Sequence, residues 1–154
     1  MLRWPELSAD LRPPHAYVPG RTARHPEGWF DHIKASAQDT ATPDALRHTA
    51  AFRTGLAYLG AGYFWECHEV LEAIWLRTPD PSPERELVQA LIQLANARLK
   101  LAMRRPKAAG RLCDMSAAHL SRCAGQATVL GVGIVDLQAE VDQTRYDLNM
   151  HYKL

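Results

Sequence analysis

Apolar residues recur at helical spacing through most of the chain after about residue 43. The clearest case is the segment 83–103, PERELVQALIQLANARLKLAM. One face of this segment carries Leu87, Leu91, Leu94, Ala97 and Leu101. Apolar residues three and four positions apart form a continuous stripe on an α-helix. Because no segment shows the sustained alternation that is typical of a β-strand, the pattern predicts an all-α protein.

Proline, glycine and short polar residues divide the apolar pattern into separate helices. Thr42-Pro43 and Ser82-Pro83 each combine a preferred N-cap with proline at the first helical position. The predicted helices cover about 43–59, 63–77, 83–103, 107–123 and 135–148, and 125–133 is expected to be a turn region. The apolar stripes of the last two helices are expected to include Leu112, Met115 and Leu120, then Val135, Leu137, Val141 and Leu148.

Residues 1–42 differ from the rest because they are rich in proline, glycine, arginine and histidine and have no sustained period. Proline removes a backbone donor, so this part is expected to be an extended arm, with one short helix in WFDHIKASA, residues 29–37. The arm is expected to lie on the helical body, because these side chains are costly to leave in water: Trp4, Tyr17, Val18, Trp29 and Phe30. The predicted architecture is an irregular bundle of about five helices, 43–154, with an extended arm, 1–42.

Composition narrows the class of protein. The chain has 154 residues and a net charge of +1, so we expect one domain with no overall field that attracts nucleic acid or an anionic membrane. No apolar run approaches the roughly 20 residues that span a bilayer, and the start lacks the apolar core of a signal peptide. The basic segment 98–111 has no aromatic residue to stack on bases. The three cysteines form no CxxC pair, which favours reduced thiols in the cytoplasm.

The segment GYFWECHEVLEAIW, residues 62–75, places polar groups in the middle of a helix with an apolar face. That face carries Phe64, Cys67, Val70, Leu71 and Ile74. His68 and Glu72, four residues apart, share its edge and are expected to touch while half-buried. Glu69 lies further round the helix, and Glu66 lies on the far side.

Three interpretations of the His68–Glu72 pair stay open. In a structural network, Glu72 accepts a hydrogen bond from His68 and further partners come from the third helix or the arm. In a ligand site, the pair would bind a small polar or cationic molecule within an aromatic frame formed by Trp65, Tyr63 and Trp75. In a metal site, His68 and Glu72 would be ligands, as in HExxH zinc enzymes with the second histidine replaced. A third ligand would then come from His15, His25, His32, His48 or His119.

Polar residues of the third helix are candidates for contact with this pair. Gln89, Gln93 and Asn96 share one edge of the helix, where they form either a solvated stripe or amide contacts with His68 or Glu72. Arg98 projects into the apolar stripe, so it is expected to pair with a carboxylate, for example Glu72, or to extend outward along its aliphatic stem.

The run from Phe52 to about Leu120 resembles the domain-of-unknown-function family 309, small helical proteins of bacteria and archaea. The motif that carries the resemblance stands here as Gly62, Tyr63, Phe64, Glu66, His68, Glu69, Glu72 and Trp75, followed by Gln89 and Gln93. The arm resembles an N-terminal extension of some members, with Tyr17, Pro19, Gly20, His25 and Pro26 as the matching residues. Lys100 stands where members often have a histidine. The resemblance implies an irregular all-α bundle and brings no established activity.

The sequence therefore predicts a cytoplasmic helical domain of bacterial type, without an assigned enzymatic activity. Its candidate pocket consists of His68, Glu69, Glu72, Trp65, Trp75, Tyr63 and Gln89. The alternatives are a metal-dependent hydrolase that uses His68 and Glu72, with Glu69 as acid, and a homodimeric interaction protein. The leading interpretation expects no cofactor, whereas the hydrolase alternative requires a divalent metal. The expected partners are a small polar ligand or a second copy of the chain.

Overall fold

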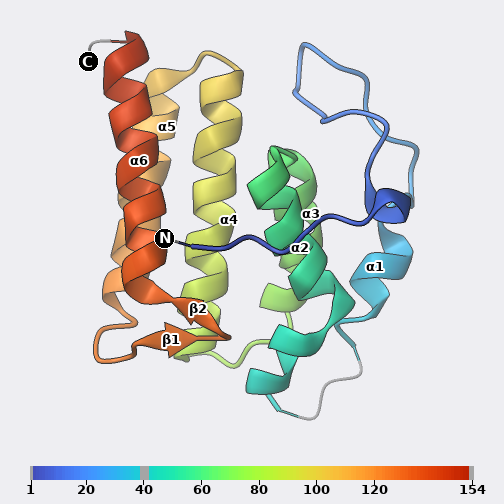
Figure 1. Ribbon diagram of the computed structural model, residues 1–154, viewed down its shortest axis with the longest axis vertical. Coiled ribbons are helices and arrows are strands. Elements are labelled where there is room, and N and C mark those ends of the chain that lie inside the picture. The colour runs from blue at the N-terminus through green and yellow to red at the C-terminus, as the bar shows by residue number, and fades with distance from the viewer. Residues whose placement is uncertain (1, 39–41, 153–154) are drawn as a thin grey trace.

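The computed structural model describes residues 2–38 and 42–152, and within them the chain is mostly helical, with a largely non-helical N-terminal arm (Figure 1). Six α-helices form: α1 (Asp31–Ala35), α2 (Ala50–Ala61), α3 (Phe64–Trp75), α4 (Pro83–Ala102), α5 (Pro106–Ser121) and α6 (Ile134–Tyr152). Two 3-10 helices, η1 (Ala9–Leu11) and η2 (Asp44–His48), and a hairpin of β1 (Thr128–Val129) and β2 (Val132–Gly133) complete the described elements. The all-α class is confirmed.

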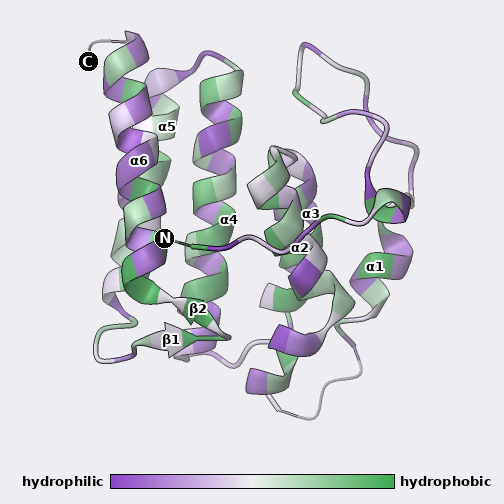
Figure 2. Cartoon of the chain, viewed as in Figure 1, coloured by the Kyte–Doolittle hydropathy of each residue, from purple (hydrophilic) through white to green (hydrophobic). Residues whose placement is uncertain are grey.

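Helix α4 lies at the centre of the bundle. It packs against α3 on one side and α5 on the other, while α2 packs on α3 and α6 packs on α5 (Figure 1). Hydrophobic and hydrophilic residues alternate around each helix, as expected when one face is buried (Figure 2). No helix of the described ranges combines the length and apolarity that crossing a membrane would require.

The predicted helix starts are confirmed at α4 and changed at α2. The Ser82 side chain accepts a hydrogen bond from Arg85 N, and Pro83 occupies the first position of α4. Thr42 also accepts a hydrogen bond from a following amide, but it precedes η2, whose N-cap is Pro43. Thr49 caps α2 by accepting from Phe52 N at 3.1 Å. Because Thr49 has an extended backbone, the predicted single helix from 43 is divided at this residue.

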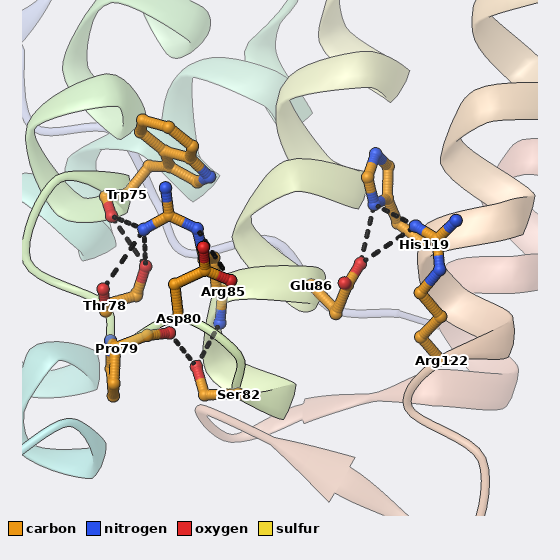
Figure 3. Close-up of polar contacts among 9 residues, drawn as sticks. All are labelled: Trp75, Thr78, Pro79, Asp80, Ser82, Arg85, Glu86, His119 and Arg122. Atoms are coloured by element: carbon orange, nitrogen blue, oxygen red, sulfur yellow. Dashed lines mark hydrogen bonds and ion pairs between the residues drawn. The ribbon is translucent and has the colours of Figure 1, made fainter.

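The connection between α3 and α4 is held by one arginine (Figure 3). The Arg85 guanidinium lies over the Trp75 ring, 3.7 Å from its centroid, and donates to Thr78 O at 3.2 Å. Ser82 Oγ donates to Pro79 O at 2.7 Å in the same connection. A cation stacked on an aromatic face and bonded to backbone carbonyls explains why this proline-rich stretch keeps a defined path.

Three local predictions differ from the structure. Met115 and Val135 were expected on apolar stripes but are exposed, because each lies two positions, ~200° around the helix, from a buried residue, Cys113 and Leu137 respectively. The turn region 125–133 contains the short hairpin. Leu130 and Gly131 join its strands with φ of 51° and 76°, the positive values that favour tight hairpins.

Gly55 allows α2 and α3 to approach closely. A Cβ placed on Gly55 would lie 2.5 Å from Leu71 Cδ2, and Leu71 is fully buried. Gly110 on α5 is the matched case with room, because a Cβ there would lie 3.5 Å from Leu148 Cδ2. The two glycines therefore differ in packing rather than in secondary structure.

We expect Gly55→Ala to lower the free energy of unfolding by about 1–3 kcal/mol, because overpacking outweighs the better helix propensity of alanine. Gly110→Ala should be neutral or more stable by up to about 1 kcal/mol. Urea unfolding followed by circular dichroism measures both. Equal stability of Gly55→Ala and wild type would contradict the close approach of the two helices.

The three cysteines, Cys67, Cys113 and Cys123, are free and buried. Burial raises the pKa of each thiol, to about 11 for Cys123, where Glu86 and Glu84 add to the effect.

Since the thiolate is the nucleophile, we expect the folded protein to react with a disulfide reagent at pH 8 far more slowly than the urea-unfolded chain. A native thiol that reacts at the unfolded rate would contradict this burial.

Candidate functional site

Glu66 of α3 binds the arm to the helical body. Its side chain is fully buried, and its Oε2 accepts hydrogen bonds from Tyr17 N at 2.7 Å and from His25 Nε2 at 2.6 Å. The sequence places Glu66 on the far side of the helix from the apolar face. That side is not solvated, because the arm covers it.

His25 is enclosed together with Glu66. Its side chain is 2% exposed, and four rings surround it: His15, Trp29, Phe30 and Trp65. His25 Nδ1 and Glu66 Oε1 find no hydrogen-bond partner among the described residues, and both atoms are closed to solvent. The pair is therefore a sealed structural anchor rather than an open catalytic dyad.

Two further contacts hold the arm against α2. The Tyr58 hydroxyl donates to Leu11 O at 2.6 Å. Burial, with a smaller effect of the Glu66 carboxylate, raises the pKa of Tyr58, so its hydroxyl keeps the proton that it donates. Trp4 packs directly on Gly60, where a Cβ would overlap the indole side chain. The arm therefore contacts the body at several separate points.

The predicted pair of His68 and Glu72 is present, at 3.1 Å between Nε2 and Oε1. The Glu72 side chain is 54% exposed, more than expected, because this edge of α3 faces solvent. The hydrogen bond therefore joins successive turns of one helix, and the expected network between two helices is not formed by this pair. An exposed pair of this kind contributes only about 0.3–0.5 kcal/mol. His68 Nδ1 is buried and has no partner among the described residues.

Most of the other expected pocket residues contact different neighbours. Glu69 pairs with Lys34 of α1, while Trp75 lies against Arg85 at the α3–α4 connection (Figure 3). The Tyr63 hydroxyl accepts from Arg12 at 3.5 Å. Gln89 forms no hydrogen bond to His68 or Glu72 in the described ranges, and Gln93 is buried.

Arg98 pairs with α6 and not with Glu72. Its Nε donates to Thr144 Oγ1 at 3.2 Å, and its Nη2 lies 3.8 Å from Glu140 Oε2. Arg98 therefore has a carboxylate partner, as expected, but that partner, Glu140, belongs to α6 and not to α3.

The described residues do not assemble a metal site around His68 and Glu72. Nowhere in 2–38 and 42–152 do three or more histidine, cysteine, aspartate or glutamate side chains gather closely enough to hold a metal ion. Of the five histidines considered as a third ligand, His25 bonds to Glu66, His119 bonds to Glu86 at 2.7 Å, and His15 bonds to Ala23 O at 2.6 Å. His32 and His48 are exposed.

A cleft of about 490 Å³ lies between the arm, α1 and α3; we name it the arm cleft. Its charged lining residues are Arg24, Glu27, Asp31, Lys34 and Glu69. Its aromatic lining residues are Tyr17, Phe30 and Trp65, beside the His25 ring. Trp65 and Glu69 are the only two members of the predicted pocket among the lining residues. The arm residues were missed as a site because nothing in the sequence indicates which face of α3 they cover.

We expect Glu66→Ala to loosen the arm, because it leaves Tyr17 N and His25 Nε2 buried without a partner, at about 1–3 kcal/mol for each unsatisfied group. Hydrogen exchange of the Tyr17 amide should accelerate, and the free energy of unfolding should fall. Glu72→Ala, which removes an exposed carboxylate of the same helix, is the matched control and should leave both unchanged within about 0.5 kcal/mol. Unaltered Tyr17 exchange in Glu66→Ala would refute the anchoring role.

One protein family is similar to part of the chain. Residues 52–112 match the model of the family described as Domain of unknown function (DUF309). No curated protein and no solved structure matches the chain significantly. The match spans α2, α3, α4 and the start of α5, and it includes Glu66, His68 and Glu72. Over these residues, the chain is similar to the DUF309 family.

Proposed function

We propose that this protein binds a small organic cation in the arm cleft. The observation that supports the proposal is the composition of the lining, in which three carboxylates face two cations beside three aromatic rings. One of the cations, Lys34, is already paired with Glu69. Among the remaining charged lining residues, the two carboxylates of Glu27 and Asp31 outnumber the one cation, Arg24. The lining therefore favours a positively charged ligand.

The aromatic residues support the same class of ligand. Trp65 and Tyr17 form an edge contact, with ring centroids 5.2 Å apart, at the wall of the cleft. An organic cation over such rings gains about 0.5–1 kcal/mol at an exposed site and more when it is desolvated. The Glu66–His25 anchor holds Tyr17 and the following loop in place, so the family motif would act on the ligand indirectly, by keeping the arm wall of the cleft in position.

We also propose that the protein is located in the cytoplasm. Three cysteines that are free and buried suit a reducing compartment, because oxidising compartments favour disulfides. This supports residence in the cytoplasm.

We expect millimolar tetramethylammonium or methylguanidinium to change the tryptophan fluorescence of the protein in a saturable titration, because Trp65 lines the cleft. Asp31→Asn should weaken the affinity about fivefold, the loss of roughly 1 kcal/mol of favourable electrostatics. Asp44→Asn is the matched control, since Asp44 also lies in the first turn of a short helix but outside the cleft. Neutral tert-butanol that binds as well as the cations, or an Asp31→Asn variant that binds like wild type, would rule out cation recognition here.

A further inference from the structure

Arg98 is a largely buried cation whose terminal nitrogens lack hydrogen bonds within the described residues. Its side chain is 18% exposed, and only Nε makes a hydrogen bond, to Thr144. The 3.8 Å between Nη2 and Glu140 is an ion-pair distance, beyond hydrogen-bond range. Burial lowers the pKa of Arg98, whereas Glu140 and Asp147 act in the opposite direction. A guanidinium offers paired N–H donors that match a carboxylate.

Arg98 lines a cavity that is separate from the arm cleft. The cavity has a volume of about 480 Å³ and lies where the end of α2 meets α4 and α6. Its apolar lining is supplied by Leu59, Phe64 and Leu101. Gly60 and Gly62 also line it, and their lack of side chains leaves room there.

Asp147 supplies an opposite charge in the same cavity. Gln143 Nε2 donates to its Oδ1 at 3.0 Å, and no other hydrogen bond to this carboxylate occurs among the described residues. The negative charge of Asp147 acts to raise the pKa of Arg98, against the effect of burial. The cavity therefore presents one cation and one carboxylate, both with unused hydrogen-bonding capacity, next to an apolar wall.

We propose that this cavity binds an apolar α-amino acid. The carboxylate of the ligand pairs with the terminal nitrogens of Arg98, its ammonium group pairs with Asp147, and its side chain packs on Leu59, Phe64 and Leu101. A simple anion fits less well, because it would face Asp147. A simple cation fits less well, because it would face Arg98. A zwitterion satisfies both charges at once, and buried charges require such pairing.

Calorimetric titration of the full chain with L-leucine tests the ligand class. Two analogues each lack one charge: 4-methylpentanoate has no ammonium group, and 3-methylbutylamine has no carboxylate. We expect leucine to bind at least about tenfold more tightly than either analogue. No heat of binding with leucine in the millimolar range, or equal affinity for one of the analogues, would overturn the proposal.

Substitutions test the location. Asp147→Asn keeps the acceptor for Gln143 and removes the charge, so leucine affinity should fall about tenfold while binding of 4-methylpentanoate is retained or improved. Asp142→Asn is the matched control, because Asp142 accepts from Gln138 at the same 3.0 Å in the same helix but is exposed. Arg98→Lys keeps the charge and loses the paired donors, so leucine binding should also weaken. A folded Asp147→Asn variant with wild-type leucine affinity would refute the site.

Discussion

The fully buried carboxylate of Glu66 is the constraint on which the arrangement of the arm depends. A carboxylate removed from water needs hydrogen-bond donors, and here both donors come from the arm, through Tyr17 N and the His25 ring. The helical body cannot satisfy Glu66 within α3, because a helix uses its own amides for the backbone ladder. Arm and body are therefore joined at this point, and the anchor helps to hold the arm wall of the cleft in place.

The acidic residues of the family motif serve different purposes although they occupy two turns of one helix. Glu66 points to the arm, Glu69 pairs with Lys34 of α1, and Glu72 reaches solvent beside His68. A step of three residues turns the helix by ~300°, so each carboxylate faces a different neighbour. In the sequence these residues resemble one catalytic cluster. In the structure, Glu66 contacts the arm, Glu69 contacts α1, and Glu72 forms a surface pair with His68.

Side chains of opposite charge, Arg98 and Asp147, also line the second cavity. Arg98 leaves the apolar stripe of α4 and meets Glu140 and Thr144 of α6. The cost of burying this guanidinium is only partly offset by one hydrogen bond and a long ion pair. That incomplete pairing distinguishes Arg98 from Arg85, whose guanidinium is both stacked on Trp75 and bonded to backbone carbonyls.

The sequence by itself determined the helices, because apolar spacing and capping residues act locally. It predicted Ser82-Pro83 at the start of α4 and the i, i+4 contact of His68 with Glu72. Only the tertiary structure decided which of these polar groups are buried. Glu66 is sealed and Glu72 is exposed because the arm, which has no periodic pattern, covers one side of α3 and leaves the other open. Burial depends on contacts between distant segments, and no local spacing in either segment encodes that choice.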